Sequence, residues 1–586
     1  MELVTIPDKP MKLTFGVMCQ GTVFRAWQAQ CIRDLLSMEN IQLSLLILED
    51  KSDDKKIKKI DVTPSKFKNM KRYVKQSILV RPIRFIANEV FPIFRLNLFS
   101  HYKEKFVKPS VDQPVDLSEL LRNIDRISCK IVKKGNYSQY FQDSDLKTIS
   151  DYRLDFILRF GFNIIRGDIL TVPKYGVWSF HHDDEEKYRG GPACFWEIYG
   201  GDPVTGAMLQ RLTDRLDGGI VLRKGYFKTK DQPYSENIFE NLMKLYSGNI
   251  DSVYVEAARW PGYVVRDLFN DTADYLFDPP SKTQAPVYRT PTNYQMIIYY
   301  LKHKIKSFFN PQTRTKKMQW NIGLVDKPIQ NFVEKENKIQ IQWYPLRTTD
   351  NFFLADPFGE YKDEKLTIFC EKCDLTTNFG EIVTLVSDKN SFSEPKKYFD
   401  KLSCHLSYPY LFNVKGEVYL VPESRKIREI NLFKATKFPE TWERILTIAR
   451  DIDAADSAIF FYNDMWWLTY LDQSIGINCS LCILYAKDLS GPWMPHKANP
   501  VKQDVRSARP AGTPFIHNGS LYRPSQDCSE RYGGRIIINK ITILTPSKFQ
   551  EEFVTAINPI HPFAEGIHTI MAVGNYTLID GCRSLE

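Results

Sequence analysis

Residues that can move a proton or stabilise a charge follow one another in the first half of the chain. Ser179 and His181 are separated by a single residue, the pair Arg189-Gly190 comes next, and Asp217 closes the segment. A histidine and a carboxylate that a fold brings together can accept and return a proton during a reaction. These residue types in this order indicate an acyl-transfer enzyme rather than a scaffold.

Alternating strands and helices are expected to position these residues. Buried strands are predicted at 12–19, 43–48, 154–160 and 175–180, and a helix is predicted at 24–38. A strand, a helix and a second strand in this order are typical of a doubly wound α/β sheet. Such a sheet binds ligands beyond the carboxyl ends of its strands, and several of the candidate residues follow these strands directly. The sequence has no GxGxxG motif, so a dinucleotide is not expected.

The second half of the chain has a different pattern, in which short aromatic strands replace helical periodicity. An apolar strand, a polar turn and an aromatic strand recur at 356–369, 408–420, 456–468, 514–522 and 568–578. Repeats at a spacing of roughly 50 residues are typical of a β-propeller. The sequence therefore predicts an all-β five-bladed propeller, with an irregular β-sandwich as the alternative.

The first half resembles the folate-dependent formyltransferases in the order and spacing of its short motifs. That family has Asn-x-His, an Arg-Gly turn, Thr-Gly and Asp-x-Leu-Asp-x-Gly; here they read Ser179-Phe180-His181, Arg189-Gly190, Thr205-Gly206 and Asp214-Arg-Leu-Asp217-Gly-Gly. The resemblance implies transfer of a formyl group from 10-formyltetrahydrofolate to an amine. It also implies that His181 and Asp217 handle the proton, and that Ser179 replaces the asparagine that polarises the formyl oxygen.

The same resemblance extends to residues that would bind the substrates. The residues at the family's folate-binding positions are Arg159, Phe160, Gly161, Phe162 and Asp214. The residues expected to contact the amine substrate are His182, Asp183, Arg189 and Gly190. The acidic segment 183–186 would suit a cationic amine, and a solvated loop is the alternative. No metal site is expected, because adjacent histidines rarely point at one ion.

The second half resembles the five-bladed propellers of glycoside hydrolases and the propeller-like region of plant glucosamine inositolphosphorylceramide transferases. The residues predicted to form a sugar site are Asp356, Glu423, Asp456, Arg509, Arg523, Gln526, Asp527 and His568. An inverting glycosidase needs two carboxyl groups about 6.5–9.5 Å apart. The order Asp, Glu, Asp differs from the hydrolases' usual Asp, Asp, Glu. The alternative is that these polar groups only join neighbouring blades.

Composition and charge divide the chain and limit its partners. The 586 residues are too many for one core. We predict a formyltransferase-like α/β domain over 1–275, a connecting segment over 276–335 and the propeller over 336–586. The stretch 51–108 is predicted to be a basic helical insertion, and with the basic stretch 302–317 it would suit peripheral contact with an anionic membrane. A solvated helical insertion is the alternative.

The remaining sequence features favour a cytoplasmic protein, with peripheral association at the inner membrane face as an option. The chain has no secretory signal or long apolar run, and its cysteines are scattered. The net charge of +9 permits an anionic partner but does not require one. No nucleic acid is expected, since the C-terminal half lacks the small basic barrel that would grip tRNA. The oligomeric state is not predicted.

The sequence therefore predicts a carbohydrate-modifying protein. The first domain would transfer a formyl group from 10-formyltetrahydrofolate to an amino sugar, nucleotide- or lipid-linked, and the propeller would bind or process a glycosyl unit. The alternative is a degenerate formyltransferase domain that acts as a binding module beside a glycosyl-active propeller.

Overall fold

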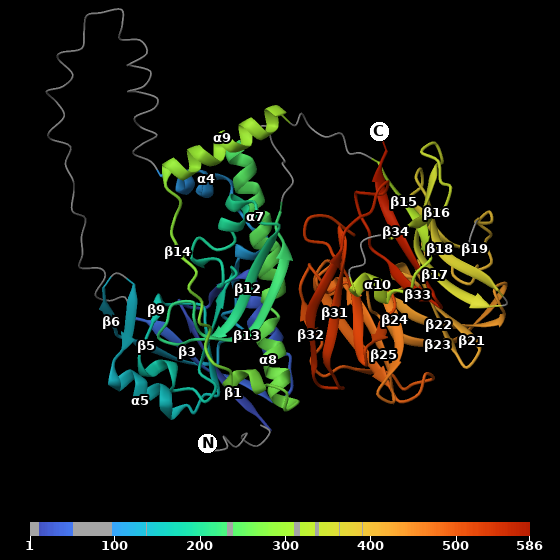
Figure 1. The fold of residues 1–586 in the computed structure, drawn as a ribbon. Helices are drawn as coiled ribbons and strands as arrows, with labels where there is room; N and C mark the ends of the chain where they lie inside the picture. Colours follow the sequence, from blue (N-terminus) through green and yellow to red (C-terminus); the bar gives the residue numbers. More distant parts are fainter. Residues whose placement is uncertain are drawn as a thin grey trace, which may run out of the picture. The chain divides into compact units, whose positions relative to one another are not determined.

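The computed structural model describes residues 11–50, 97–135, 137–230, 238–309, 317–334, 339–362, 364–388 and 391–585. The chain divides into two units (Figure 1). The first comprises Met1–Lys224, Thr229–Phe269 and Ala273–Gln312, and the second comprises Gly225–Lys228, Asn270–Thr272 and Thr313–Glu586. Residues 51–96, most of the predicted basic insertion, lie outside the described residues.

A seven-stranded sheet forms the centre of the first unit, in the spatial order β13-β12-β10-β8-β1-β3-β5. The strands are β1 (Leu13–Cys19), β3 (Ile41–Glu49), β5 (Asp125–Cys129), β8 (Phe156–Arg159), β10 (Val177–His181), β12 (Val204–Arg211) and β13 (Ile220–Lys228). Strands β10, β8, β1, β3 and β5 are parallel to their neighbours, whereas β12 is antiparallel to β10. The central strand β1 is almost entirely buried, as a parallel sheet covered on both faces requires. The expected α/β arrangement is therefore confirmed.

Helices pack against this sheet and against one another. They are α1 (Ala26–Leu36), α4 (Leu98–Phe106), α5 (Asp143–Asp151), α6 (Trp196–Gly200), α7 (Ile238–Ala257), α8 (Trp260–Phe269) and α9 (Asn293–Phe309). Helix α1 buries Ile32 and Leu35 and packs against β3 and α8. Helix α7 lies beside β12, and α9 packs against both α4 and α7 (Figure 1).

Short elements complete the first unit and hold its loops. Small sheets pair β2 (Val23–Arg25) with β4 (Pro114–Asp116), β6 (Ile131–Lys134) with β7 (Ser138–Phe141) and β9 (Ile164–Ile165), and β11 (Arg189–Gly190) with β14 (Val287–Tyr288). The short 3-10 helices are η4 (Ser110–Asp112), η5 (Asp168–Leu170) and η6 (Asp274–Phe277). The β11–β14 pair ties the Arg-Gly motif to a segment far along the chain.

Within the described residues, five sheets of antiparallel strands form the second unit. Four of them comprise β17 (Phe352–Lys362), β18 (Lys365–Asp374) and β19 (Phe379–Ser387); β20 (Ser407–Val414), β21 (Glu417–Glu423), β22 (Glu429–Lys437) and β23 (Thr441–Arg450); β24 (Ala454–Tyr462), β25 (Met465–Asp472), β26 (Ser480–Ala486), β27 (Met494–Pro495) and β28 (Lys502–Gln503); and β29 (Phe515–His517), β30 (Ser520–Asp527), β31 (Arg535–Leu544) and β32 (Phe549–Ile557). The fifth joins β15 (Met318–Val325) and β16 (Ile341–Trp343) to β33 (Ile570–Val573) and β34 (Tyr576–Ser584). Short helices are α10 (Gln330–Val333), η7 (Arg425–Ile427) and η8 (Gln473–Ile475).

Each predicted repeat of the second half contains a hairpin of a different sheet. The hairpins are β17–β18, β20–β21, β24–β25, β29–β30 and β33–β34. The all-β character of the second unit is therefore confirmed. Among the described residues no strand of one sheet pairs with a strand of another, and closure into a five-bladed propeller stays a prediction.

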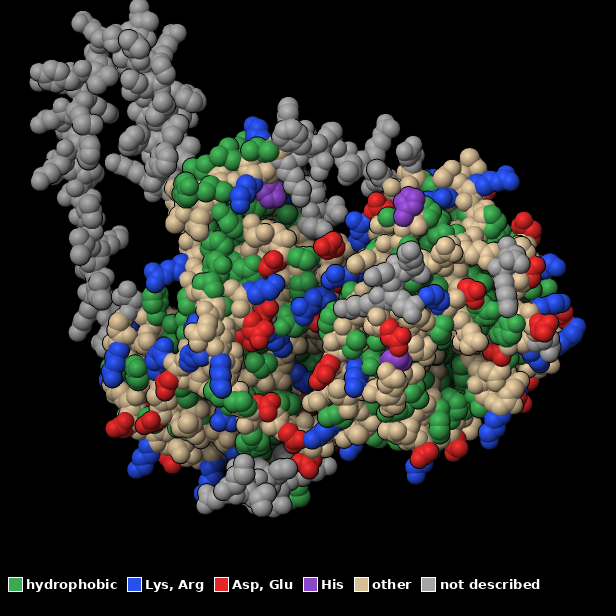
Figure 2. Space-filling model, viewed as in Figure 1, with side chains coloured by type: hydrophobic (Ala, Val, Ile, Leu, Met, Phe, Trp, Pro, Cys, Tyr) green, Lys and Arg blue, Asp and Glu red, His purple; other side chains and the backbone are tan. Residues whose placement is uncertain are grey.

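The segment 276–335, for which we predicted a connection, contains regular structure. Helix α9 lies in the first unit, where Met296 and Tyr299 are buried, and strand β15 lies in the second. Figure 2 shows apolar side chains on the surface of α9, where Leu301 and Ile305 are exposed. No helix within the described residues is long and apolar enough to cross a membrane.

Candidate active site

His181 and Asp217 lie together where strand β10 of the first unit's central sheet ends. His181 is the last residue of β10, and Asp217 lies in the loop between β12 and β13. The Nδ1 atom of His181 is 3.6 Å from a carboxylate oxygen of Asp217, and both side chains are largely buried. The structure thus brings together the two residues that the sequence predicted to handle the proton.

The ring of His181 is oriented by the backbone of the following loop. Its Nε2 atom lies 3.0 Å from the carbonyl oxygen of Tyr188, which can only accept a hydrogen bond. Nε2 therefore carries a proton, and a neutral imidazole keeps its lone pair on Nδ1, on the side of Asp217. A proton taken up at Nδ1 would be held between the imidazole and the carboxylate.

The Arg189-Gly190 motif positions Asp217. The amide of Gly190 donates to the Asp217 carboxylate at 2.9 Å, and Arg189 donates to the carbonyl oxygen of Leu216 at 2.7 Å. Gly190 has a φ of 87°, and a Cβ there would lie 2.3 Å from the carbonyl oxygen of Tyr288, so only glycine fits. We predicted substrate contacts for Arg189 and Gly190; in the structure both hold the loop that carries Asp217.

Ser179, which stands in place of the formyltransferases' asparagine, is bound by Arg159 from the neighbouring strand β8. The Nε and Nη2 atoms of Arg159 donate to the Ser179 hydroxyl oxygen at 3.1 and 2.9 Å. Its Nη1 atom donates to the carbonyl oxygens of Phe162 and Asn163 at 3.3 and 2.8 Å. Burial lowers the pKa of Arg159, while the charge of Asp217 opposes that shift.

Other backbone groups of the predicted folate loop also have partners inside the protein. The amides of Phe160 and Gly161 donate to the carbonyl oxygen of Met18 at 2.9 and 2.8 Å. Asp214 accepts a hydrogen bond from the amide of Gly167 at 3.2 Å. A ligand at this loop would therefore be contacted mainly by side chains and by the second lone pairs of carbonyl oxygens.

A pocket with a volume of about 470 Å³ opens beside Ser179 and Arg159. Its lining residues are Cys19, Gln20, Val23, Phe24, Arg25, Trp27, Gln28, Asp112, Pro114, Arg159, Phe160, Phe162, Ser179, Phe180, His182 and Tyr254. Within the described part of the chain, Nε1 of Trp27 and Nε2 of His182 are buried without a hydrogen-bond partner. Such atoms cost about 1–3 kcal/mol each when left unpaired, so they indicate a ligand.

His182 lines this pocket and is not placed to act as a second proton-transfer group. Its ring stacks on Tyr254 with ring centroids 3.5 Å apart, and it lies parallel to Phe180 at 5.5 Å. Burial, together with the neighbouring His181, lowers the pKa of His182 well below its usual range. His182 is therefore neutral at physiological pH.

Three residues of the acidic segment after the histidines, Asp183, Asp184 and Glu185, are buried, whereas Glu186 is exposed. Asp183 is buried, accepts a hydrogen bond from a backbone amide at 2.6 Å and lies beside the carboxyl group of Glu197. The Nζ atom of Lys224 lies 2.9 Å from both Asp184 and Glu185. We predicted that this segment attracts a cationic amine or forms a solvated loop. The solvated loop is wrong for the three buried residues, whose carboxyl groups have partners inside the protein, and the contact with a cationic amine stays a prediction.

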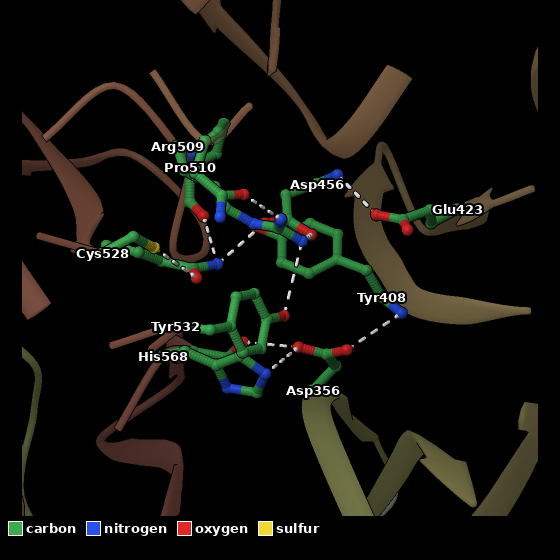
Figure 3. A network of polar contacts seen from close by, with 12 residues as sticks. Asp356, Tyr408, Glu423, Asp456, Arg509, Pro510, Cys528, Tyr532 and His568 are labelled. Atoms are coloured by element: carbon green, nitrogen blue, oxygen red, sulfur yellow. Dashed lines mark hydrogen bonds and ion pairs between the residues drawn. The ribbon is translucent and has the colours of Figure 1, made fainter. Parts of the chain in front are cut away.

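In the second unit, three strands carry the same irregularity. Strands β17, β20 and β24 each contain a bulge, at Asp356, Tyr408 and Asp456, where φ is 53°, 42° and 53°. A bulge bends the strand and redirects a side chain. The three residues meet in one polar cluster, together with Glu423, Arg509 and His568 (Figure 3).

The carboxylates of this cluster are held by specific donors. Asp456 accepts hydrogen bonds from Nε and Nη2 of Arg509 and, at 2.7 Å, from Gln526. Asp356 accepts from the hydroxyl of Thr569 at 2.7 Å. The side chain of Glu423 accepts from the backbone amide of Asp456 at 2.8 Å. The cluster thus links strands of four different sheets and the segment that carries Arg509.

His568 lies between two carboxylates. Its Nε2 atom is 3.6 Å from Asp356, and its Nδ1 atom contacts Asp580. Although burial lowers it, the two carboxylates raise the pKa of His568 to about 9. The ligand atoms of these three residues lie within 4.8 Å of one another. A metal ion bound by these ligands would have to displace the proton that His568 holds at neutral pH.

Arg523 and Asp527 take part in other ion pairs. Arg523 donates to Glu551 at 2.6 and 2.8 Å, and Asp527 accepts from Arg535 at 2.9 Å. We predicted both in the sugar site with Gln526, and the structure corrects this grouping. Successive residues of a strand point to opposite faces, so Gln526 faces the cluster while Arg523 and Asp527 face away.

Sequence reasoning missed two members of this cluster. Tyr408 was detectable, because Pro409 follows it as Pro357 follows Asp356. Asp580, whose carboxylate accepts hydrogen bonds from the backbone amides of His568 and Thr569, belongs to no recognisable motif. Its place in the cluster depends on the pairing of β33 with β34.

Known proteins resemble the two halves of the chain separately. The family profile of glucosamine inositolphosphorylceramide transferase 1, N-terminal, matches residues 338–560. Glucosamine inositolphosphorylceramide transferase 1 of Arabidopsis thaliana is 38% identical over 205 residues, 34% of this chain and 27% of that protein. A methionyl-tRNA formyltransferase of Prochlorococcus marinus is 32% identical over 98 residues, 17% of this chain and 29% of that protein. The chain thus spans less than a third of the length of either relative.

A solved structure also overlaps part of the chain. The crystal structure of alpha-L-arabinofuranosidase from Lactobacillus brevis covers 36% of this chain and 81% of its own, at 11% identity and a TM-score of 0.29, a level that decides nothing about this chain. The sequence matches are the informative ones. The N-terminal half resembles formyltransferases and the C-terminal half resembles the transferase's N-terminal region, so the predicted resemblances are confirmed.

Proposed function

We propose that the first unit transfers a formyl group from 10-formyltetrahydrofolate to the amine of an amino sugar, nucleotide- or lipid-linked. The observation that carries this proposal is the His181–Asp217 pair, in which Nδ1 faces the carboxylate and can accept a proton. The similarity to a formyltransferase supports the reaction class. The similarity of the second half to a glucosamine transferase supports a carbohydrate acceptor.

The pocket beside Ser179 fits the formyl donor in size and lining. Phe24, Phe160 and Phe162 supply flat apolar surface for a ring system, and the unpartnered Nε2 of His182 supplies a polar contact. These residues, with Asp214 at the edge of the loop, would hold the donor. Bound 10-formyltetrahydrofolate would supply an activated formyl carbon.

The residues of the chain would then manage the proton and the charge. His181 takes the proton that the amine releases at Nδ1, and Asp217 stabilises the resulting imidazolium. A positioned acid–base group of this kind contributes about 10²–10⁴-fold to a rate. Gly190 and Arg189 keep the carboxylate in place for this role.

The test is turnover of 10-formyltetrahydrofolate with a panel of amino sugars. We expect His181→Ala and Asp217→Asn to lower kcat by at least about 10²-fold without lowering the melting temperature by more than a few degrees. His101→Ala, on the exposed surface of α4, is the matched control and should keep full activity. Absence of folate turnover by the wild type, or full turnover by His181→Ala, would contradict the proposal.

A specific observation favours a second candidate, a degenerate domain that binds a ligand without transferring a formyl group. The Ser179 hydroxyl oxygen already accepts two hydrogen bonds from Arg159, and Arg159 also holds two carbonyl oxygens of the folate loop. A domain whose folate site is closed in this way should not bind a stable folate analogue. Isothermal titration with such an analogue therefore separates the two candidates.

For the second unit we propose a closed five-bladed propeller whose polar cluster binds a glycosyl unit. The contacts of β17 with β20 and β33, and of β20 with β24, support neighbouring blades. Burial, with the charge of Asp456, raises the pKa of Glu423 to about 8, so it would be protonated at neutral pH and could donate to a glycosidic oxygen. Loss of sugar binding in Asp356→Asn and Glu423→Gln, measured by titration calorimetry, would support this site, and unchanged binding would contradict it.

A further inference from the structure

The guanidinium of Arg159 has one donor that the protein does not use. Arginine presents five N–H groups. Nε and one N–H of Nη2 donate to Ser179, and Nη1 donates to the carbonyl oxygens of Phe162 and Asn163. Within the described part of the chain, the second N–H of Nη2 has no acceptor.

The hydroxyl of Ser179, like the guanidinium of Arg159, has one unused hydrogen-bond donor. A hydroxyl oxygen has two lone pairs, and both accept a hydrogen bond from Arg159. The O–H of Ser179 can therefore only donate, and the described residues offer it no acceptor. Ser179 and Arg159 both line the pocket, so these two donors are available to one ligand atom there.

The charge of Arg159 is influenced by the nearby Asp217 but is not neutralised by an ion pair. Among the described residues, no carboxylate forms an ion pair with it, and the loop carbonyl oxygens that it binds are neutral. Hydrogen bonds from a charged donor are shorter and about twice as strong as neutral ones. A cation in a pocket with two unused donors is suited to an oxygen that carries negative charge.

We propose that Arg159 and Ser179 form an anion hole that binds the formyl oxygen as it becomes negative. The proposal rests on the formyl transfer proposed above. It gives this chain two donors on adjacent strands, the charged guanidinium of Arg159 and the neutral hydroxyl of Ser179, in place of the single asparagine amide of the family that it resembles. Arg159 would then be a catalytic residue, in addition to lining the donor's pocket.

The charge on this oxygen exists only during the transfer. It forms as the amine nitrogen bonds to the formyl carbon and the C=O electron pair moves to oxygen. It disappears when the pair returns and the bond from carbon to the donor nitrogen breaks. The proton lost by the amine passes to His181 and then to the departing nitrogen. Losing one donor of this kind costs about 10²–10³ in kcat.

The experiment pairs formate binding with transfer kinetics. Formate carries the carbon, hydrogen and charged oxygen of the group in question and needs no folate. We titrate ¹³C-formate by NMR into the full chain, and separately measure kcat and KM. The variants are Arg159→Gln, Arg159→Lys and the double variant Arg159→Gln with Ser179→Asn. Arg166→Gln is the matched control, because Arg166 binds Ser138 and does not line the pocket.

We expect formate to bind the wild type and the Arg166→Gln control equally, and Arg159→Gln at least about tenfold more weakly. Arg159→Gln should lower kcat by about 10²–10³ with little change in KM, and Arg159→Lys should be intermediate. The asparagine of the double variant should restore part of kcat, a rescue that a merely structural role for Arg159 would not produce.

Two results overturn the proposal and leave formyl transfer standing: equal formate affinity in the wild type and Arg159→Gln, or unchanged kcat in Arg159→Gln. If the wild type transfers no formyl group, the proposed function fails instead. Formate binding then decides alone, since loss of binding in Arg159→Gln supports the anion hole and absence of binding by the wild type overturns it.

Discussion

At Ser179 the chain differs from the formyltransferases that it resembles, and an arginine of the neighbouring strand binds the shorter side chain. An asparagine amide carries its own N–H donors, whereas a serine hydroxyl has one proton. Arg159 fills the lone pairs of that hydroxyl and adds a donor of its own. One neutral amide is thus replaced by a neutral hydroxyl and a charged guanidinium. The formate titration therefore tests the charge of Arg159.

The buried carboxyl groups of Asp183 and Glu197 should make the stability of the first unit depend on pH. Burial raises the pKa of Asp183 well above its usual range and that of Glu197 to about 8. The folded protein then binds more protons than the unfolded chain, so the free energy of unfolding falls as the pH rises from 4.5, the unperturbed pKa of glutamate, to about 8.

Glu197→Gln imitates the protonated acid and should flatten this dependence. Between about pH 5 and about pH 8, we expect the melting temperature of the first unit to fall less steeply in the variant than in the wild type. The melting temperature is measured by circular dichroism. Glu104→Gln, an exposed acid of α4, is the control and should follow the wild type. Parallel curves for Glu197→Gln and the wild type would show that this carboxyl group does not control the slope.

The Thr-Gly motif lies in strand β12, and its two residues pack that strand against neighbouring segments. The hydroxyl of Thr205 is bound to Thr229 and Asn249 at 2.9 and 2.8 Å. A Cβ on Gly206 would lie 2.8 Å from Cα of Asp184, so the strand can approach the segment after His181 only with glycine there. The motif therefore belongs to the framework that positions the histidine.

Helix α9 is the described element that fits the predicted contact with an anionic membrane. Leu301 and Ile305 are exposed, and so are the neighbouring Lys302 and Lys304. Each lysine near an anionic surface contributes about 1 kcal/mol. We expect the double variant Lys302→Glu, Lys304→Glu to reduce flotation with phosphatidylserine vesicles at least about tenfold.

The control for this experiment reverses two exposed lysines of the second unit, Lys401→Glu and Lys415→Glu. It has the same net charge as the α9 variant, so only the position of the charge differs. Equal loss in both variants would indicate general electrostatic attraction, and a wild type that does not float would remove the membrane contact altogether. Vesicles of phosphatidylcholine alone should bind none of the proteins.

In the second unit, strands from the beginning and the end of the unit pair in one sheet. Strand β15 pairs with β34 from Met318 to Val325, and Gln319, which is fully buried, accepts hydrogen bonds from Arg583 at 2.6 and 2.9 Å. It also donates to the carbonyl oxygen of Arg347 at 3.0 Å. Side-chain contacts thus reinforce the backbone ladder that closes the fifth sheet.

We expect Gln319→Ala to lower the free energy of unfolding of the second unit by about 1–3 kcal/mol, because it leaves the guanidinium of Arg583 short of an acceptor. Calorimetry should show a lower melting temperature for the second unit while the transition of the first is unchanged. The double variant with Arg583→Ala should cost less than the sum of the single variants. Strict additivity would mean that the pair does not interact.

The sequence by itself determined the features that depend on local pattern. The alternation of strands and helices predicted the parallel sheet, and the repeats predicted a hairpin in each sheet of the second unit. The order and spacing of the motifs carried the resemblance to the formyltransferases, and that resemblance implied that His181 and Asp217 act together. None of these inferences needed to know which face of an element a side chain occupies.

Only the tertiary structure decided the partners of individual side chains. It placed Arg159 on Ser179, turned Asp183 toward Glu197, and separated Gln526 from Arg523. In each case the deciding contact joins residues far apart in the sequence or depends on the register of a strand. A one-residue change in register reverses the face of every side chain. For that reason composition and spacing could predict the pieces of these sites but not their assembly.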